Sequence, residues 1–256
     1  MPMQLDTGAI KAESRSLLRT GEVNPFRMTL FYLLITLVLD MINSGVSYMI
    51  DSAGGFTVLS FSFVSILVGL VALVLNAGYY CYCFGILRRE KMPYESLFDA
   101  FPFAGKVILL SIVEGVFIFL WSMLFVIPGI IAVYRYSFAI WNLCQNPELG
   151  VMEALNRSKR QTIGYKGQLF VLQLSFIGWS LLVLGIFLIY ELLIAALLPD
   201  SFLGIMLGSL ILTVLTGVVD IYLTPYFALS ECGFYLRATA PEEPPRQDRS
   251  SYTPEF

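Results

Sequence analysis

The sequence predicts an all-α integral membrane protein, a bundle of six transmembrane helices with both ends of the chain in the cytoplasm. Two observations predict this class. Hydrophobic residues make up 57% of the 256 residues and charged residues only 14%, whereas a soluble domain carries about a quarter charged residues. The apolar residues also gather in runs of the length that a helix needs to cross a bilayer, about 20 residues. Lipid is therefore the expected solvent for most of the chain.

The first two predicted transmembrane helices cover residues 28–50 and 57–87. The first contains Asp40, and the second contains no charged residue. Residues 1–26 are predicted to be a cytoplasmic segment with a short interfacial helix. This segment is charged and lacks the apolar core and small-residue cleavage site of a signal peptide. We therefore expect the first transmembrane helix to act as the insertion signal.

The next apolar run, residues 107–145, is too long for one transmembrane helix and contains only Glu114 and Arg135 as charged residues. Proline removes a backbone donor and glycine permits a tight turn, so Pro128-Gly129 predicts two helices, 107–126 and 129–145. If this dipeptide only kinked a single helix, the basic residues between 157 and 166 would lie outside the cell. That arrangement opposes the positive-inside rule, and six helices are favoured over five.

The last two predicted transmembrane helices cover residues 167–198 and 202–236, separated by Pro199-Asp200-Ser201. Residues 27–237 thus form one transmembrane domain. The remaining segment, residues 238–256, combines prolines and charges with few apolar residues. This composition is typical of disordered segments, so we expect a cytoplasmic tail, either passive or used as a docking peptide.

The basic residues determine the predicted orientation. All but one of the 16 Lys and Arg residues lie before the first predicted helix, between the second and third, between the fourth and fifth, or after the sixth. The exception is Arg135. Because cytoplasmic connections carry the excess of Lys and Arg, both termini are predicted to be cytoplasmic.

The cytoplasmic connections share a layout that indicates an internal repeat. Tyr80-Cys81-Tyr82-Cys83-Phe84 resembles Tyr134-Arg135-Tyr136-Ser137-Phe138, and Pro225-Tyr226-Phe227 is a fainter copy. We predict three units, each a short cytoplasmic helix followed by a transmembrane hairpin. Pro93–Phe103 and Pro147–Thr162 are predicted to be short amphipathic helices, serving as connectors or as a collar that contacts lipid or a partner.

Several polar residues are predicted deep inside the apolar helices, where ionisable groups are costly and need partners. At a helix rise of about 1.5 Å per residue, four of these residues lie roughly 12–20 Å from the cytoplasmic ends of their helices. The fifth lies about 25 Å from the cytoplasmic end of its helix. The candidate intramembrane polar site comprises Asp40, Asn76, Glu114 and Arg135, with Asp220 as the fifth. Two interpretations remain open. Either these residues line a polar cavity for an anionic group or for proton transfer, or Glu114 and Arg135 form a structural ion pair.

The sequence gives no catalytic signature. Histidine is absent, which removes the commonest metal ligand and acid–base side chain. None of the four cysteines forms a CxxC pair, and there is no phosphate-binding glycine loop, nucleophile elbow or nucleic-acid-binding basic stripe. We expect no catalytic, cofactor or metal site and no nucleic-acid partner. Membrane lipids and another membrane protein are the candidate partners.

A series of short motifs resembles a known family. It comprises Pro128-Gly129-Ile130-Ile131, Tyr136–Ala139, Asn146–Leu149, Glu153–Leu155, Arg157–Lys159, Leu169–Trp179 and Leu223–Tyr226. In this order the motifs resemble the bacterial domain-of-unknown-function 975 family of integral membrane proteins, from about Lys11 to Leu236. A more distant similarity in layout is to the membrane domain attached to some glycerophosphodiester phosphodiesterases. The resemblance implies the bacterial cytoplasmic membrane and no established activity.

Two positions depart from the family pattern. Gly167 stands where members often carry tryptophan, and three residues separate Ile131 from Arg135 where a basic residue usually follows at once. No role for Arg135 is therefore taken from the family.

Three functions are compatible with the sequence. The favoured one is a non-enzymatic accessory module that binds lipid or a partner protein. The alternative is a small transporter or permease that uses the polar site. An intramembrane lipid-modifying enzyme has the least support, because the chain has neither histidine nor paired carboxylates at a fixed helical spacing.

Overall fold

The computed structural model describes residues 4–20, 25–52, 56–190, 192 and 202–240. Every regular element in this part of the chain is a helix, which confirms the predicted all-α class. Pro199-Asp200-Ser201, most of the predicted fifth helix beyond residue 190, and residues 241–256 of the predicted tail lie outside the described residues.

The elements follow one another along the chain with short connections. They are α1 (Thr7–Thr20), α2 (Pro25–Ser52), α3 (Phe56–Leu87), the 3₁₀ turns η1 (Tyr94–Phe98) and η2 (Phe101–Phe103), α4 (Ala104–Leu124), α5 (Val126–Tyr136), α6 (Ala139–Gln145), α7 (Val151–Gln161), α8 (Lys166–Leu174), α9 (Ile177–Ile189) and α10 (Phe202–Thr239).

Several of these helices are long and apolar enough to cross a membrane. Five stretches meet the requirement on their own: Pro25–Ile50, Phe61–Leu87, Tyr94–Leu124, Val126–Gln145 and Leu203–Thr239. A sixth is present if α8 and α9, which are bent by 49° at their junction, count as one membrane-crossing unit. The chain therefore has the helices of a membrane protein, as its composition predicts.

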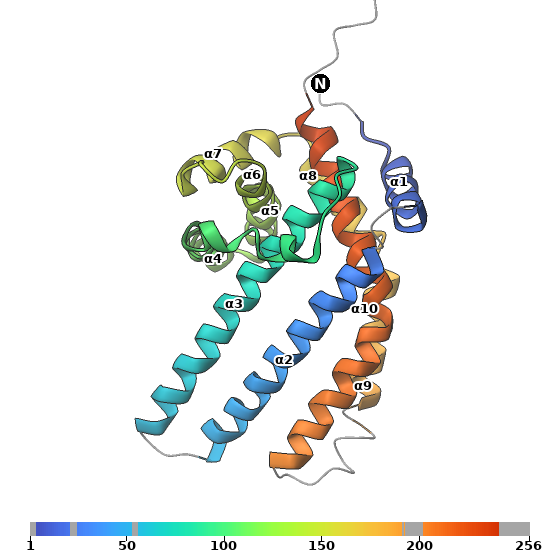
Figure 1. Ribbon diagram of the computed structural model, residues 1–256. Coiled ribbons are helices and arrows are strands. Elements are labelled where there is room, and N and C mark those ends of the chain that lie inside the picture. Colours follow the sequence, from blue (N-terminus) through green and yellow to red (C-terminus); the bar gives the residue numbers. More distant parts are fainter. Residues whose placement is uncertain (1–3, 21–24, 53–55, 191, 193–201, 241–256) are drawn as a thin grey trace, which may run out of the picture.

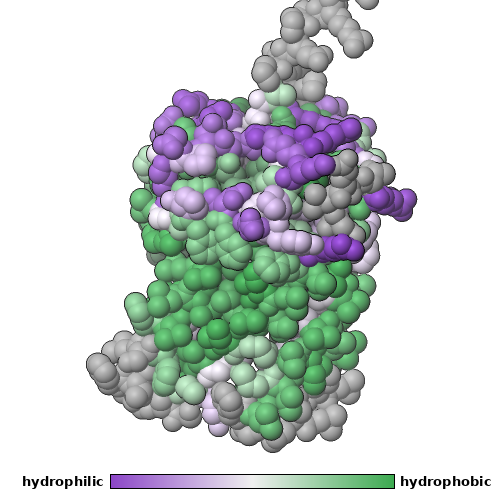
Figure 2. Space-filling model, viewed as in Figure 1, coloured by the Kyte–Doolittle hydropathy of each residue, from purple (hydrophilic) through white to green (hydrophobic). Residues whose placement is uncertain are grey.

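The molecule separates polar and apolar surfaces along its length. Figure 1 shows α2, α3 and α10 running alongside one another, with α1, α7 and the C-terminal end of α10 at one end of the molecule. Figure 2 shows hydrophilic residues gathered at this end and an apolar surface over most of the remainder. We call the end of the molecule where the hydrophilic residues gather the polar end.

The turn between α4 and α5 differs from the predicted one. The helix breaks at Phe125, which is extended (φ −163°, ψ 155°), and Pro128 lies in the first turn of α5. Proline is tolerated there because the first N–H groups of a helix have no intrahelical acceptor. Gly129 serves close packing instead, since a Cβ at this position would lie 2.2 Å from Ser122 Oγ and 3.0 Å from Ser122 Cα.

The α4–α5 hairpin does not run parallel to the long helices. Figure 1 shows α4 nearly along its axis while α2, α3 and α10 extend down the picture. The fully buried residues of α4, Val107 and Leu110, lie in its N-terminal half. The turn is strongly exposed and apolar, with Phe125 at 73% and Ile127 at 71% exposure. Such a surface needs an apolar environment.

The two predicted amphipathic segments differ from each other. Pro147–Thr162 contains α7, whereas Pro93–Phe103 forms η1 and η2 in place of one α-helix. Pro93 and Pro102 each lack a backbone donor, which disfavours a continuous helix here. Leu97 is fully buried, while Phe98 and Phe101 are exposed. Pro93–Phe103 therefore does not form the single amphipathic helix that the sequence predicts. The predicted threefold repeat stays a prediction.

Aromatic rings at the start of α6 pack against α10 at the polar end. The ring centroid of Tyr235 lies 5.2 Å from that of Phe138 and 5.8 Å from that of Trp141. The Tyr235 hydroxyl donates to Asn142 Oδ1 at 2.9 Å, and Asn142 Nδ2 donates to Gln161 Oε1 at 2.8 Å. This fully buried asparagine thus joins α6, α7 and α10 through satisfied hydrogen bonds.

Gly78 of α3 lets η1 approach the helix backbone. A Cβ at this position would lie 1.9 Å from the carbonyl oxygen of Leu97, a backbone atom that cannot rotate away. We expect Gly78→Ala to destabilise the protein by about 1–3 kcal/mol, the usual cost of overpacking. The midpoint of thermal unfolding in detergent should fall by several degrees.

Gly69→Ala, on the same helix, is the matched control. No atom lies within 4 Å of a Cβ at Gly69, and alanine is the better helix former by about 1 kcal/mol. This variant should keep or raise the midpoint. Equal midpoints for the two variants would contradict the close packing of α3 against η1.

Candidate functional site

Three of the cavities among the described helices contain four of the five candidate polar residues. The first, of about 720 Å³, lies between α2, α9 and α10 and is lined by Asp40 and Asp220. The second, of about 540 Å³, lies between α3, α8, α9 and α10 and is lined by Asn76. The third, of about 290 Å³, lies between α3, α4, α5 and α6 and is lined by Glu114 and again by Asn76.

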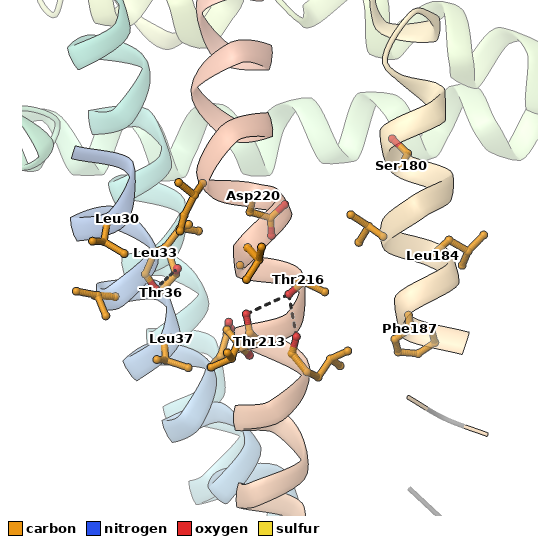
Figure 3. A pocket seen from close by; sticks show the side chains of 18 residues that line it. Leu30, Leu33, Thr36, Leu37, Ser180, Leu184, Phe187, Thr213, Thr216 and Asp220 are labelled. Atoms are coloured by element: carbon orange, nitrogen blue, oxygen red, sulfur yellow. Dashed lines mark hydrogen bonds between the residues drawn. The ribbon is translucent and has the colours of Figure 1, made fainter. Parts of the chain in front are cut away.

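The first cavity is an apolar chamber with two carboxylates. Figure 3 shows Asp220 on α10 between the leucines of α2 and the Ser180, Leu184 and Phe187 side chains of α9. Asp40 enters the lining from α2. None of the described residues that line this cavity is Lys or Arg.

The three threonine hydroxyl groups of the first cavity are already used as donors. Thr36 donates to the Leu33 carbonyl at 3.0 Å, and Thr213 donates to the Ser209 carbonyl at 2.9 Å. Thr216 similarly donates to the Leu212 carbonyl at 3.0 Å. A hydroxyl has one proton and two lone pairs, so these groups can only accept further hydrogen bonds. Together with the two carboxylates they make the cavity suitable for a ligand that donates hydrogen bonds or carries positive charge.

The second cavity contains a buried hydrogen-bonded carboxylate, Glu231, which is 3% exposed. Its Oε1 accepts from Gln173 Nε2 at 2.7 Å, and its Oε2 accepts from the Tyr80 hydroxyl at 3.3 Å. The Tyr134 hydroxyl donates to Gln173 Oε1 at 2.8 Å. The network joins α3, α5, α8 and α10.

The sequence analysis did not include Glu231 in the candidate site, because it lies near a helix end where hydration is expected. Two signals pointed to its partners. Gln173 lies within the family-like run Leu169–Trp179, and Tyr80 and Tyr134 are equivalent positions of the two similar segments. Only the fold brings all of them to one carboxylate.

The third cavity contains Glu114 without Arg135. Glu114 Oε1 is buried and has no hydrogen-bond partner, and Arg135 is not among the residues that line the cavity. No ion pair joins these two described side chains within 4.0 Å. The structural ion pair, one of the two interpretations drawn from the sequence, is therefore not formed, and Arg135 stands apart from the other four candidate residues.

The backbone of Arg135 has a structural role at the junction of α5 and α6. Ser158 of α7, which is fully buried, donates to the Arg135 carbonyl at 2.9 Å and accepts from the Phe138 N–H at 3.2 Å. One hydroxyl thus satisfies a donor and an acceptor at the helix junction. This pair of hydrogen bonds explains why a serine stands at position 158 in Arg157-Ser158-Lys159.

Helix α1 lies over the second cavity at the polar end. Lys11 Nζ donates to Ser175 Oγ at 2.9 Å and lies 4.5 Å from the ring centroid of Phe176, which lines the cavity. Burial lowers the pKa of Lys11, and the neighbouring Arg15 lowers it further. Arg15 lies 5.6 Å from the ring centroid of Tyr226. Cation–π contacts therefore hold the basic α1 on the bundle.

The four cysteines are not joined by disulfide bonds. The Cys144 thiol donates to the Ala77 carbonyl at 3.4 Å, and all four cysteines are free. In the part of the chain that the structure describes, no three Cys, Asp or Glu side chains are grouped closely enough to hold one metal ion.

The fold and cavities define an all-α protein with several membrane-capable helices and acidic internal cavities. Residues 123–242 match the family model described as "Protein of unknown function (DUF975)", and over this part the chain is similar to that family. The match begins at the end of α4, so it is shorter than the resemblance inferred from the motifs. No curated protein and no solved structure matches the chain.

Glu231→Gln tests the network of the second cavity. Both carboxylate oxygens of Glu231 accept hydrogen bonds. In the glutamine variant, the amide NH2 group would stand where one of these acceptors was and would face a donor of the network. An unsatisfied buried polar group costs about 1–3 kcal/mol, and the midpoint of thermal unfolding in detergent should fall accordingly. Glu148→Gln in the exposed connection before α7 is the control and should leave the midpoint unchanged. A Glu231→Gln protein as stable as this control would show that the network does not hold the helices together.

Proposed function

We propose that this chain is a non-enzymatic, multi-pass protein of the bacterial cytoplasmic membrane that binds a membrane-soluble cation in the cavity lined by Asp40 and Asp220. This is a specific form of the lipid- or partner-binding module favoured by the sequence. The proposal rests on the combination of two carboxylates with a lining of apolar and hydroxyl side chains and no described basic lining residue.

The energetic argument concerns the cost of charge in an apolar environment. A carboxylate among hydrocarbon side chains is expensive unless an opposite charge or a set of donors accompanies it. Among the described residues, neither Asp40 nor Asp220 forms a hydrogen bond or an ion pair through its side chain, and the threonine hydroxyls beside them offer lone pairs. A ligand with an ammonium-like centre would supply the missing charge, and the leucines would accommodate its apolar part.

The cavity has the size and position expected of a ligand site. A volume of about 720 Å³ falls within the range of small-molecule pockets, roughly 300–1,000 Å³. Asp40 lies near the middle of α2 and Asp220 near the middle of α10, well away from both helix ends. The ligand would therefore reach the site from the lipid phase, and membrane lipids with cationic groups are candidate ligands.

The proposed topology has six transmembrane units: α2, α3, α4, α5–α6, α8–α9 and α10. The polar end would face the cytoplasm, because the Lys and Arg residues of the connections before α2, before α4 and before α8 belong to that side under the positive-inside rule. This proposal requires the α4–α5 hairpin to cross the bilayer in both directions, although it is inclined to the long helices in Figure 1.

Phe125→Cys tests whether the hairpin crosses. If it does, a membrane-impermeant maleimide should label this cysteine on intact cells, above the baseline of the protein with its own four cysteines. Glu148→Cys, in the connection predicted to be cytoplasmic, should be labelled only after lysis. Labelling of Phe125→Cys restricted to lysed cells, or absent altogether, would contradict six transmembrane units and indicate a hairpin that does not reach the outer surface.

A transporter or permease is the second candidate function. The supporting observation is that the three cavities share lining residues: Ser180 lines the first and second, and Asn76 and Tyr80 line the second and third. The cavities thus form a series of neighbours, each separated from the next by the side chains that they share. A bound cation could pass along this series if the intervening side chains moved.

Two lipophilic ions of similar shape and opposite charge test the binding proposal. We expect purified protein in nanodiscs to bind tetraphenylphosphonium in equilibrium dialysis and to bind tetraphenylborate no better than empty nanodiscs do. The double variant Asp40→Asn/Asp220→Asn should lose tetraphenylphosphonium binding by at least about tenfold, equivalent to roughly 1.4 kcal/mol.

Asp99→Asn, an exposed carboxylate beside η1, serves as the control and should bind the cation as the unmodified protein does. Equal binding of the two ions, or undiminished cation binding by the double variant, would overturn the proposal.

A further inference from the structure

We infer a second, separate ligand site: the cavity between α3, α4, α5 and α6 binds a monovalent inorganic cation at Glu114. This inference does not rest on the proposed function, because none of the residues that line this cavity lines the cavity of Asp40 and Asp220.

The first argument is an unsatisfied carboxylate oxygen. Glu114 Oε1 is buried without a hydrogen-bond partner, whereas both oxygens of Glu231 have donors. Buried polar atoms are nearly always paired with protein groups, water or an ion. Glu114 lies in the middle of α4, about 15 Å from its N-terminal end, and it lines a partly open cavity of about 290 Å³. A cation bound in this cavity would supply a partner for the carboxylate of Glu114, which is one of its lining residues.

The second argument is the set of oxygens around the same space. Ser111 lies one helical turn before Glu114 on α4, Asn76 contributes an amide from α3, and Ser137 contributes a hydroxyl from the junction of α5 and α6. Ser137 donates its proton to the Tyr134 carbonyl at 3.1 Å, so its oxygen keeps lone pairs for a cation. Hard cations prefer such carboxylate, amide and hydroxyl oxygens.

The third argument is the charge of the site. Glu114 is the only carboxylate among the described lining residues, and no Lys or Arg is among them. One negative charge is matched by one monovalent cation, whereas calcium sites in proteins usually combine several carboxylates. Because a water molecule occupies about 30 Å³, the volume also accommodates several waters that complete the coordination of the ion.

The charged groups nearby do not neutralise Glu114. Lys159 of α7 lies 5.6 Å from the ring centroids of Phe117 and Tyr136 and donates to Asn156 Oδ1 at 3.1 Å. It is not a lining residue of the cavity. Arg135 of α5 forms no ion pair with Glu114, so the carboxylate remains available for a mobile cation.

Thermal unfolding of the purified protein in detergent tests the inference. Sodium, potassium and choline chlorides are exchanged at constant ionic strength, with choline as the cation too large to be coordinated. We expect sodium or potassium to raise the unfolding midpoint saturably above its value in choline. Glu114→Gln keeps the size of the side chain but removes its charge, and should abolish this rise.

Two further variants complete the test. Ser111→Ala should shift the midpoint of the cation titration to a several-fold higher concentration, and it remains informative if Glu114→Gln fails to fold. Glu153→Gln, an exposed carboxylate on α7, should respond to cations as the unmodified protein does.

Failure of this inference is distinguishable from failure of the proposed function. Glu114→Gln should retain tetraphenylphosphonium binding, because Glu114 does not line the first cavity. The inferred cation site would be overturned if sodium and potassium raised the unfolding midpoint equally in the unmodified protein and in Glu114→Gln. It would also be overturned if neither ion raised the midpoint of the unmodified protein.

Discussion

The cost of placing carboxylates in an apolar environment is the constraint on which the structure depends. Asp40, Glu114, Asp220 and Glu231 all lie on long apolar helices. Such groups must find donors, an opposite charge or water. Glu231 obtains donors from Tyr80 and Gln173. The other three face cavities, and the functional proposals follow from this difference.

The packing of the polar end keeps these side chains in position. The close approach at Gly78 seats η1 on α3, and Ser158 fixes the junction of α5 and α6. Asn142 joins α6 to α7 and α10. Away from this end the helices present mostly apolar side chains to their surroundings, as Figure 2 shows. The architecture thus combines a well-packed polar end with helices that are spaced widely enough to leave internal cavities.

Composition and run length were sufficient to predict the all-α class and the apolar helices, because both depend on the solvent more than on detailed packing. The position of the α4–α5 turn was not predictable in the same way. Pro128-Gly129 resembles a turn signal, yet proline also suits the first turn of a helix, and Phe125 carries no turn signature. Local sequence cannot separate these alternatives.

The prediction of the candidate site was limited in the same way. Depth along a helix identified Asp40, Asn76, Glu114 and Asp220, which line cavities. Depth alone also selected Arg135, which lines none of these cavities, and passed over Glu231, which is buried by side chains from other helices. The distance of a residue from a helix end does not say which neighbours surround it. That information comes only from tertiary packing.

Native mass spectrometry of the protein, released from nanodiscs prepared directly from its own membrane, tests the central claim most directly. The account predicts a retained small molecule that carries a positively charged group and an apolar part, and that is lost from the protein when Asp40 and Asp220 are both replaced by asparagine. Retention of only anionic molecules, or of the same molecule irrespective of these two residues, would contradict an acidic ligand site between α2, α9 and α10.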